Sequence, residues 1–587
     1  MQRMIGALLF SAALSACATA TDAPKPALAQ TAPSREAMVA AVDPRAVEAG
    51  AAMLAKGGSA TDAAIAAALV LGLIEPQSAG IGGGAFLVGY EADTRRVRVF
   101  DGREWAPAGA TPDMFLQPDG KPMPFGQAVQ SGRSIGTPSA IAMYKLAHNK
   151  AGKLPWATLF EPAIALADQG FAVTPRLAMM VKFAQDRGGL TDPTARAYLM
   201  PDGKPLEAGQ IVRNAAYAET LRAIAKRGPS AMTKGPIAEG IVAAAQAEPR
   251  AGTLTLKDLQ AYRPREVTPV CGAYRAFRVC GAPPPSSGGV AVLQILDTFA
   301  RVRPTPEGPK SVDDWSAFLW ASRLAYADRD HYLADDTVVP VPTYGLIAPE
   351  YLQDRAKMID LARAPQGAVQ PGDPAKIIGG ESLLDRWGLA SPPMGAGTTH
   401  ISVVDGAGNA VALTATVESI FGSQRFTNGF FLNNQLTDFS LVPSRNGKPV
   451  ANAVAPGKRP RSSMSPTVVL RPDGTLEMVV GSPGGSAIIG YVAKTIIGAL
   501  DWNLTVQDSI ALANLTGSGP VVRTEMQRLD PDVAAALTAR GWTLQPTTLE
   551  NSGIHAIRVT PNGLQGGADP RREGAVKSVA VPQGRAR

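Results

Sequence analysis

The pattern of apolar residues changes abruptly at Thr398, and this change limits the possible fold more than any other feature of the chain. Before it, residues 138–265 and 311–335 mostly show the spacing of helices, interrupted by Pro and Gly. After it, residues 398–404 and 409–417 alternate polar and apolar side chains around a DGAG turn, which is the pattern of a β-hairpin. Helices combined with hairpins predict an α+β fold in which stacked antiparallel sheets have helical covers.

Further elements are predicted on both sides of this point. Residues 465–482 and 555–569 have the alternation and the Gly-containing turns of hairpins. Residues 44–75 predict two Ala-rich helices separated by a Gly-Gly pair, and the second begins at Ser59 with a weak capping box. The second helix is too short to span a bilayer, so we expect it to be buried.

A glycine-rich run, GIGGGA at 80–85, matches the dinucleotide-binding fingerprint only formally. It follows a predicted helix and precedes a predicted strand, whereas a dinucleotide loop needs the reverse order. We interpret the run as a tight turn at which backbones approach closely. The sequence therefore predicts no nucleotide cofactor here.

The N-terminus has the layout of a secretory signal. Arg3 precedes an apolar run at 4–16, which is too short for a membrane span. The run ends in LSAC, which resembles a bacterial lipobox and would make Cys17 the lipidated first residue of the mature chain. The alternative is ordinary signal cleavage after residues 18–20, which leaves a soluble protein. Both predict export, and we expect residues 18–35 to be a flexible tether.

Composition excludes two classes of function. The net charge is +7, but the basic residues are scattered, whereas a nucleic-acid surface needs a basic stripe with interleaved aromatics. The chain has four His, and its cysteines lack zinc-like spacing, so no metal site is expected. Cys271 and Cys280 flank a short predicted hairpin. They either pair in an oxidising compartment or remain two half-buried thiols.

Thr398 is the candidate nucleophile. It follows a Pro/Gly-rich segment, 365–397, and opens a strand. If the Gly397–Thr398 bond is cut, Thr398 gains a free α-amine whose pKa is near ~8, so that one residue supplies both the nucleophile and a general base. Gly484 and Gly485 lie between a predicted strand and a helix start, where free N–H groups can stabilise an oxyanion.

A set of motifs in fixed order covers nearly the whole mature chain. They are GGSATDAAIAAALVLGLIEPQSAGIGGGAF at 57–86, DGREWAP at 101–107, PPPSSGG at 283–289, TTHISVVD at 398–405, FLNNQLTDFS at 431–440, RPRSSMSPT at 459–467, GSPGGS at 481–486 and GADPR at 567–571. With these motifs the chain resembles the gamma-glutamyltransferase (gamma-glutamyl transpeptidase) family. The resemblance implies an N-terminal-nucleophile hydrolase, a four-layer αββα sandwich that a large and a small subunit form together.

The N-terminal pattern and the resemblance together predict how the chain is divided: the first gives the signal peptide and the lipid anchor, and the second gives the two subunits. Residues 1–17 would be the signal peptide with lipobox, 36–397 the large subunit and 398–587 the small subunit. Self-cleavage at Gly397–Thr398 would release the nucleophile, and the two subunits would stay associated. The enzyme would be periplasmic, anchored to the outer membrane through its lipid, and would need no cofactor.

Residue roles follow from the same resemblance. Thr416 would hydrogen-bond the Thr398 hydroxyl, and Gly484 and Gly485 would form the oxyanion hole. The substrate α-carboxylate and α-ammonium would be held by two sets of side chains. The carboxylate set is Arg103, Ser462 and Ser463, and the ammonium set is Asp438 and Gln435. The implied reaction transfers a γ-glutamyl group, from glutathione among other compounds, to water, an amino acid or a peptide.

Two departures from the family pattern stand out. Glu418 occupies a position where better-known members carry an Asn that helps hold the α-amino group; a carboxylate can still bind an ammonium there. The segment LVPSRNGKPV at 441–450 is shorter than the lid of many members and lacks an aromatic, so we expect a more open site.

Three alternatives remain. One is a cephalosporin (glutaryl) acylase, whose substrates lack the α-amino group. Another is an esterase built on Ser134 in GRSIG, although the preceding segment is too short and polar for a buried strand. The third is a non-catalytic exported lipoprotein that binds a ligand. Keeping both Arg103 and Asp438 favours γ-glutamyl substrates.

Overall fold

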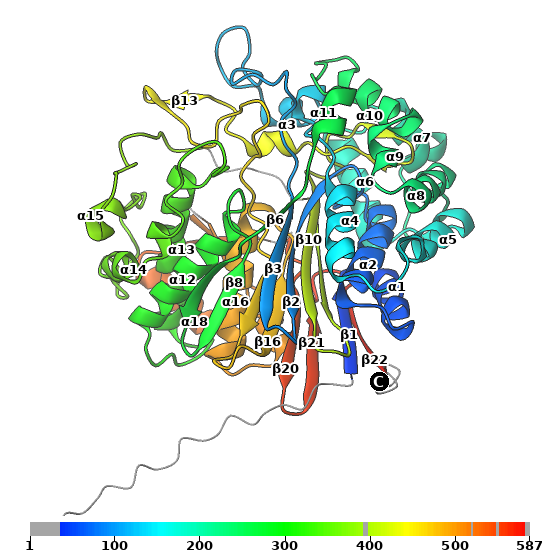
Figure 1. Cartoon of the computed structure of the whole chain (residues 1–587). Helices are drawn as coiled ribbons and strands as arrows, with labels where there is room; N and C mark the ends of the chain where they lie inside the picture. Colours follow the sequence, from blue (N-terminus) through cyan, green and yellow to red (C-terminus); the bar gives the residue numbers. More distant parts are fainter. Residues whose placement is uncertain (1–35, 391–396, 518–520, 548–550, 581–587) are drawn as a thin grey trace, which may run out of the picture. The chain divides into compact units, whose positions relative to one another are not determined.

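Two antiparallel β-sheets lie at the centre of the described chain (Figure 1). The computed structural model describes residues 36–390, 397–517, 521–547 and 551–580, all of which belong to one unit spanning Pro33–Arg587. The expected signal peptide, the tether and Cys17 lie outside the described residues. So does the segment 391–396 that precedes the expected cleavage site.

The first sheet has seven strands, and β9 (Gly397–Val404) and β10 (Ala410–Glu418) pair at its centre. Two strands follow beyond β9, namely β1 (Glu36–Ala41) and then β22 (Ala575–Ala580). Three follow beyond β10, namely β2 (Gly84–Glu91), β3 (Arg96–Gly102) and β6 (Arg265–Val267). All neighbours are antiparallel. Strands from before and after Thr398 therefore form one sheet.

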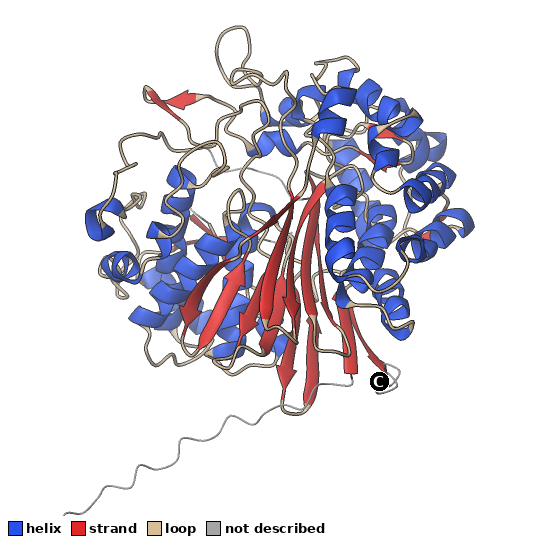
Figure 2. Ribbon diagram, viewed as in Figure 1, coloured by secondary structure: helices blue, strands red, loops and turns tan. Residues whose placement is uncertain are grey.

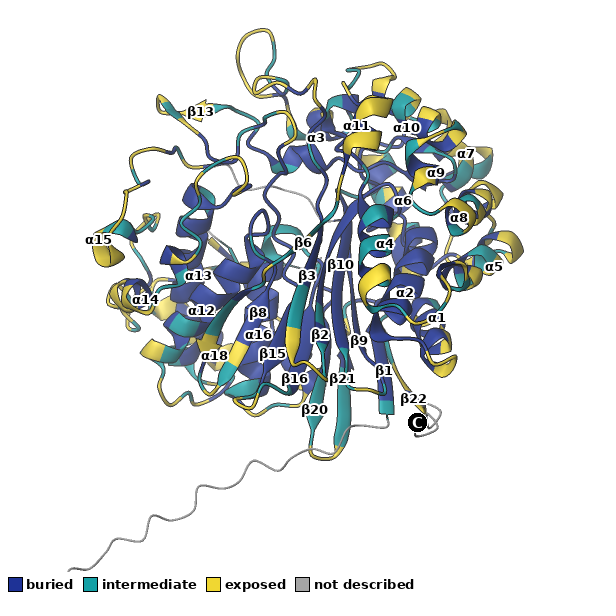
Figure 3. Ribbon diagram, viewed as in Figure 1, coloured by how far each residue is buried: buried dark blue, intermediate teal, exposed yellow. Residues whose placement is uncertain are grey.

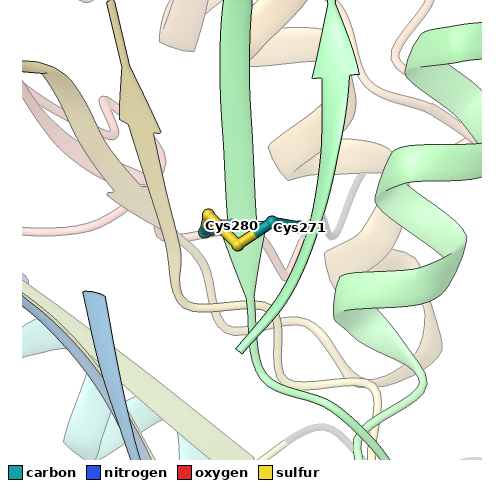
Figure 4. The surroundings of a disulfide bond; sticks show 2 residues. All are labelled: Cys271 and Cys280. Atoms are coloured by element: carbon teal, nitrogen blue, oxygen red, sulfur yellow. A yellow bond between two sulfur atoms is a disulfide. The ribbon is translucent and has the colours of Figure 1, made fainter. Parts of the chain in front are cut away.

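The second sheet has six antiparallel strands and likewise mixes both parts of the chain. Its order is β21 (Gly563–Ala568), β20 (His555–Thr560), β16 (Leu476–Gly481), β15 (Thr467–Leu470), β8 (Phe277–Gly281) and β7 (Val270–Tyr274). Cys271 of β7 faces Cys280 of β8, and the two form a disulfide (Figure 4). Of the two sequence interpretations, the structure has the paired one.

Alternation along the strands explains the layers. In β1, Ala37, Val39 and Ala41 enter a core shared with α1 (Pro44–Ala55) and α2 (Ala60–Ile74), while Met38 and Ala40 enter a core shared with the second sheet. Since successive strand side chains point to opposite faces, the first sheet is buried on both sides. The far side of the second sheet is covered by α12 (Gly288–Val302), α13 (Val312–Tyr332) and α16 (Ile488–Leu500). The order is helix, sheet, sheet, helix (Figure 2).

The remaining helices surround these layers. Before Thr398 they are α3 (Phe125–Val129), α4 (Ala140–Ala151), α5 (Glu161–Gln169), α6 (Pro175–Asp186), α7 (Pro193–Leu199), α8 (Ala215–Arg227), α9 (Ser230–Thr233), α10 (Pro236–Gln246), α11 (Leu256–Ala261), α14 (Pro349–Ala356) and α15 (Ala375–Ile378). After it they are α17 (Val506–Ala511) and α18 (Pro531–Ala539). Short strand pairs also occur: β4 (Phe171–Ala172) with β5 (Ile211–Val212), β11 (Phe426–Thr427) with β12 (Phe430–Phe431), and β13 (Ser444–Arg445) with β14 (Lys448–Pro449). A three-stranded sheet joins β17 (Leu515–Thr516), β18 (Val521–Thr524) and β19 (Thr543–Pro546).

Helix α2 shows why the sequence places a helix in the core. The Ser59 side chain accepts from the Asp62 N–H, and the Asp62 side chain accepts from the Ser59 N–H, so the predicted capping box is present. Asp62 also accepts the N–H groups of Lys153 and Leu154. Every residue of α2 is buried, as predicted (Figure 3). No helix among the described residues is long and apolar enough to cross a membrane.

The other sequence predictions of local structure are also confirmed. The pairs β9–β10, β15–β16 and β20–β21 are the expected hairpins, and α13 lies within the expected 311–335 segment. The glycine run is a close-packed turn. A Cβ at Gly82 would lie 2.1 Å from the Phe431 carbonyl oxygen, and one at Gly83 would lie 2.0 Å from that of Thr416. The turn thus brings α2 against β10.

Candidate active site

The first residues of β9 face the last residues of β10. Thr398 is opposite Thr416, and Gly397 is opposite Glu418 across an irregularity in the pairing. The Oγ1 atoms of Thr398 and Thr416 are 3.1 Å apart. The Thr416 hydroxyl donates to the Gly397 carbonyl oxygen at 2.5 Å, and Thr416 Oγ1 accepts from the Glu418 N–H at 2.9 Å.

These contacts fix the direction of the Thr398–Thr416 hydrogen bond. A threonine hydroxyl has one proton, and Thr416 gives its proton to the Gly397 carbonyl. The Thr398 hydroxyl must therefore be the donor to Thr416 Oγ1. Thr416 polarises the carbonyl of the Gly397–Thr398 bond and at the same time accepts the proton of the adjacent hydroxyl. This is the arrangement that attack of Thr398 on that carbonyl requires.

Glycine is the only residue type that fits at position 397 without displacing the neighbouring backbone. A Cβ there would lie 2.3 Å from the Ser419 carbonyl oxygen and 2.9 Å from that of Gln77. Contacts this short do not occur for real Cβ atoms, so a larger residue would shift β10 or the loop after α2. Packing therefore requires glycine at the position before Thr398.

Gly484 and Gly485 lie between β16 and α16, both with positive φ, at 134° and 60°. Glycine adopts such angles without strain. A Cβ at Gly484 would lie 2.4 Å from Tyr491 Cε2, so packing also excludes a side chain. The structure gives their N–H groups no acceptor within the described part of the chain. Gly485 lines the same cleft as Thr398, as an oxyanion hole requires.

A buried ion pair lies deeper in the cleft. One Arg103 nitrogen donates to Asp438 Oδ2 at 2.5 Å and to the Arg461 carbonyl at 2.8 Å. Asp438 Oδ2 also accepts from Gln435 Nε2 at 2.8 Å. The Gln435 Oε1 atom is buried and has no donor among the described residues. An ammonium ion in the cleft would satisfy Gln435 Oε1 and pair with Asp438.

Glu418 contributes a second carboxyl group to the same cleft. Its Oε2 accepts from Ser419 Oγ at 2.7 Å and from the Asn434 side chain, and no arginine lies within ion-pairing distance of it in the described residues. Burial, followed by the Asp438 carboxylate, raises the pKa of Glu418 to about 8, while Ser419, Asn434 and Arg103 act in the opposite direction. Two carboxyl groups, those of Asp438 and Glu418, and the guanidinium of Arg103 therefore line one cleft.

Ser462 and Ser463 also line the cleft. Ser463 Oγ accepts from Arg329 at 2.6 Å, and Arg329 Nε also donates to Ser287 Oγ at 2.9 Å. Because its lone pair is engaged by a cation, the Ser463 hydroxyl proton is left to point toward a bound anion. The Ser462 hydroxyl oxygen accepts from the Met464 N–H at 3.1 Å, which likewise leaves its proton free.

The structure thus brings nearly all the predicted site residues together. One cleft is lined by Arg103, Thr398, Thr416, Glu418, Gln435, Asp438, Ser462, Ser463, Met464, Gly485, Ser486 and Ile488. Gly484 does not line it but adjoins Gly485. Their individual roles stay predictions. The described residues contain no group of three or more His, Cys, Asp or Glu that could hold a metal ion.

Sequence reasoning missed two buried charged residues behind this cleft. Glu104 lies 4.0 Å from Arg103, has no hydrogen bond to its carboxylate oxygens among the described residues, and has its pKa raised to about 8 by burial. Its only signal was its place after Arg103 in DGREWAP. Arg329 could have been suspected because it stands on a helix that is otherwise buried.

The esterase alternative finds no structural support. Ser134 is buried in a short 3₁₀ turn (Gly132–Ser134), and its hydroxyl contacts the Val129 and Ser131 carbonyls at 2.8 and 2.7 Å. A nucleophile elbow instead exposes its serine between a strand and a helix.

Comparison with known proteins gives a consistent result. The family model described as "Gamma-glutamyltranspeptidase" matches residues 46–579. The chain is 34% identical over 550 residues to a protein of Bacillus subtilis (strain 168) named glutathione hydrolase proenzyme, covering 93% of this chain and 92% of that protein. It is 36% identical over 553 residues to a protein of the same name from Escherichia coli (strain K12), covering 92% and 91%.

A similar solved structure carries a different name. The crystal structure of cephalosporin acylase from Bacillus halodurans superposes with a TM-score of 0.80 at 27% identity, covering 96% of this chain and 99% of that one. The shared architecture is that of the N-terminal-nucleophile hydrolases.

Proposed function

Because this chain belongs to the gamma-glutamyltranspeptidase family, we propose that it cleaves itself at Gly397–Thr398 and then hydrolyses or transfers γ-glutamyl groups, with glutathione as one donor. The small subunit would begin at Thr398. Both sheets combine strands from before and after that residue, so the two products of cleavage stay associated. Breaking the connection leaves the hydrogen bonds between strands intact.

Three groups would carry out self-cleavage: the Thr398 hydroxyl, the Gly397 carbonyl and the Thr416 hydroxyl, which meet where the start of β9 pairs with the end of β10. The Thr398 oxygen attacks the Gly397 carbonyl carbon while its proton passes to Thr416, which polarises the carbonyl oxygen. The Thr398 nitrogen takes up this proton, relayed through Thr416, as the C–N bond breaks, and the acyl group moves from that nitrogen to the Thr398 oxygen. Water then hydrolyses this ester. The products are a Gly397 carboxylate and a Thr398 residue with a free α-amine and a free hydroxyl.

The same hydroxyl then serves the substrate reaction. The α-amine accepts the hydroxyl proton, and the oxygen attacks the γ-carbonyl carbon of the donor. The N–H groups of Gly484 and Gly485 stabilise the oxyanion. The amine leaves with the proton, which forms a γ-glutamyl ester on Thr398. Water or an acceptor amine attacks this ester and regenerates the enzyme.

The charged and hydroxyl groups that line the cleft support a γ-glutamyl donor. A substrate carboxylate would meet the hydroxyls of Ser462 and Ser463 and Nη1 of Arg103, the guanidinium nitrogen that has no hydrogen bond in the described residues, since Nε donates to the Pro460 carbonyl and Nη2 to Asp438 and the Arg461 carbonyl. Its ammonium would meet Asp438, Gln435 Oε1 and Glu418. Arg103 and Asp438 contact each other, so the carboxylate and the ammonium of one α-carbon would meet opposite charges that already lie side by side.

The observation that carries the proposal is the Thr416 hydroxyl bound to the Gly397 carbonyl and next to the Thr398 hydroxyl. A denaturing gel of the mature protein tests the first half, because two fragments are expected. Incubation with glutathione, with and without a dipeptide acceptor, tests the second half. A single uncleaved chain on the gel, or no release of cysteinylglycine, would reject the proposal and favour the ligand-binding alternative.

Glutaryl acylase activity is the second candidate, favoured by the similarity to the cephalosporin acylase structure. A glutaryl group is a γ-glutamyl group without its ammonium. With such a substrate Gln435 Oε1 would stay without a donor, and Asp438 and Glu418 would have no cationic ligand to pair with; buried polar groups without partners oppose binding. Relative rates on γ-glutamyl and glutaryl anilides decide between the two candidates.

The protein's location is proposed to be the periplasmic side of the outer membrane, with Cys17 lipidated. The LSAC sequence supports lipidation. The Cys271–Cys280 disulfide supports export, because disulfides persist in oxidising compartments.

A further inference from the structure

Arg572 is a buried cation that contacts the backbone of the proposed nucleophile. Its guanidinium donates from Nη1 to the Thr398 carbonyl oxygen at 3.4 Å, a long hydrogen bond. The other two nitrogens donate to the Ser552 and Asn551 carbonyls, both at 2.9 Å. The side chain is completely excluded from solvent. None of the roles described above uses this residue.

The end of β1 explains how a side chain reaches Thr398. Strand β1 ends at Ala41, opposite Ile401, so it does not extend alongside residues 398–400. Its neighbour β22 begins at Ala575, opposite Ala41. Arg572 therefore stands just before the strand that borders this gap. Gly553 lies between Arg572 and the turn that carries the predicted oxyanion hole: a Cβ at Gly553 would lie 2.8 Å from Arg572 Nε and 2.7 Å from Pro483 Cγ.

The charge of Arg572 is only partly balanced. Its nearest carboxylate is Glu75, at the end of α2, whose Oε2 is 3.9 Å from Arg572 Nη1 and has no hydrogen bond in the described residues. Glu75 is shared with Arg176, at 3.8 Å. Asp569 instead pairs with Arg571 at 3.0 Å, and Glu573 accepts the Arg176 N–H at 3.0 Å.

We propose that Arg572, with Glu75 as its partial counter-charge, lowers the proton affinity of the Thr398 α-amine and so keeps the general base unprotonated near neutral pH. The proposal rests on self-cleavage, which creates this amine. The carbonyl oxygen and the α-nitrogen of one residue are separated by three bonds, so the guanidinium lies within about 7 Å of the amine. A cation at that distance disfavours a second positive charge.

The size of the effect follows from Coulomb's law. With an effective dielectric constant near ~20–40, a unit charge about 6–7 Å away shifts a pKa by roughly one to two units. Glu75 offsets part of this. Burial raises the pKa of Glu75 to about 7, with Arg572 and Arg176 opposing that rise, so its charge is incomplete at neutral pH. The net displacement expected from Arg572 is about one unit.

Other charged or titratable groups surround Arg572 and Glu75. From neighbouring segments they are Arg176, Asp43, Asp569, Glu573 and His555. Burial, followed by repulsion from Arg176, lowers the pKa of Arg572 to about 9, so it is still charged over the range in which an α-amine titrates. Burial lowers the pKa of His555 to about 4, so His555 is neutral over that range. Among these charged groups, Arg572 is the cation that contacts Thr398, so it is the one that we expect to lower the proton affinity of the amine.

The test measures the amine directly. Cyanate carbamylates only unprotonated amines, so the rate at Thr398 of the mature protein, followed by mass spectrometry of the small subunit between pH 5 and 9, gives the midpoint of its titration. We expect Arg572→Gln to raise the midpoint by about one unit, Arg572→Lys to leave it within a few tenths, and Glu75→Gln to lower it by up to about half a unit.

Opposite shifts from Arg572→Gln and Glu75→Gln distinguish an electrostatic effect from a loss of packing, which would not reverse its sign. The matched control is Arg222→Gln, which removes an exposed cation paired with Asp168 and should change nothing. An unchanged midpoint in Arg572→Gln overturns the proposal. If that variant does not mature, an unchanged or raised midpoint in Glu75→Gln overturns it instead. The readout uses no substrate, so failure of γ-glutamyl transfer would be seen separately.

Discussion

The hydroxyl oxygens of Thr398 and Thr416 lie 3.1 Å apart, and Thr416 gives its own proton to the carbonyl of the bond that precedes Thr398. One side chain thus contacts both the attacking oxygen and the attacked carbonyl. This relationship depends on the register of the β9–β10 pair, in which Thr398 and Thr416 are directly opposite. The proposed maturation would therefore depend on this strand pairing.

Replacement of the nucleophile should stop maturation. Thr398→Ala removes the only hydroxyl that attacks the Gly397 carbonyl, so a single unprocessed chain without activity is expected on a denaturing gel. Thr398→Ser keeps the hydroxyl and should still mature. An Ala variant that splits at Gly397 would show that another group cleaves the bond.

Loss of the Thr416 hydroxyl should slow maturation without abolishing it. Thr416→Ala removes the donor to the Gly397 carbonyl, and a lost oxyanion-type donor typically lowers a rate by about 10²–10³-fold. Thr416→Ser, which restores the hydroxyl, serves as control. The rate of fragment formation in pulse-chase samples is the measurement. Equal rates for the Ala and Ser variants would contradict this role.

Binding of an α-amino acid should depend on pH through Glu418. Burial and then the Asp438 carboxylate raise the pKa of Glu418 to about 8, so the group is mostly protonated at pH 7 in the empty cleft. An ammonium binds its carboxylate form. The apparent affinity should therefore rise with pH until about pH 8. Well below pH 8, each drop of one pH unit should weaken binding by close to tenfold.

The measurement is the inhibition constant of L-glutamate between pH 6 and 8.5. An inhibition constant reports binding and not turnover, so proton transfer by the catalytic base does not enter it as a step. Glu418→Gln should flatten the profile, because a glutamine does not titrate. Glutarate, which lacks the ammonium, is the ligand control and should show no such dependence. A sloping profile retained in the Gln variant would assign the titration to another group.

Much of the local structure could be predicted from the sequence. The hairpins 398–417, 465–482 and 555–569 follow from alternation and turn residues, and α2 follows from its capping residues. Strand β1 could not be predicted. Its sequence, EAMVAA, is short and Ala-rich, and its partner β22 lies at the other end of the chain. Its strand conformation is stabilised by pairing and burial, not by local propensity.

The site likewise contains residues that could be predicted from the sequence and residues that could not. Thr398, Gly484 and Arg103 stand in motifs that the sequence shows directly. Arg572 reaches the Thr398 carbonyl because β1 ends early, and it lies 3.9 Å from Glu75, which follows α2. No spacing in the sequence marks such a contact. Arg329 is one of several charged residues on the mostly buried helix α13, and nothing in the sequence marks its bond to Ser463.

Lipidation of Cys17 should anchor the protein to a membrane. Cys17→Ser removes the thiol that receives the lipid, so it should abolish incorporation of labelled fatty acid and move the protein from the membrane to the soluble fraction. Catalytic activity should persist, because Cys17 lies outside the described unit that holds the site. Wild-type protein found entirely in the soluble periplasmic fraction would favour cleavage after residues 18–20 instead.

Recognition of the α-ammonium should depend on Asp438 and distinguish two donors. A glutaryl group has the carboxylate of a γ-glutamyl group but not its ammonium. Asp438→Asn removes the charge that pairs with the ammonium while keeping an oxygen for Arg103. Hydrogen bonds to charged groups contribute about 1.5–3 kcal/mol, and about 1.4 kcal/mol is a factor of ten. The variant should therefore lower kcat/KM for a γ-glutamyl anilide by roughly ten- to a hundredfold.

The same variant should change kcat/KM for a glutaryl anilide far less, because that substrate never used the carboxylate. Ser463→Ala provides the matched control. Its hydroxyl faces the carboxylate that both substrates share, so both activities should fall by similar factors. Equal losses of the two activities in Asp438→Asn would mean that Asp438 acts by holding Arg103 and not by binding the ammonium. Wild-type preference for the glutaryl anilide would place this chain among the acylases despite its ammonium-binding groups.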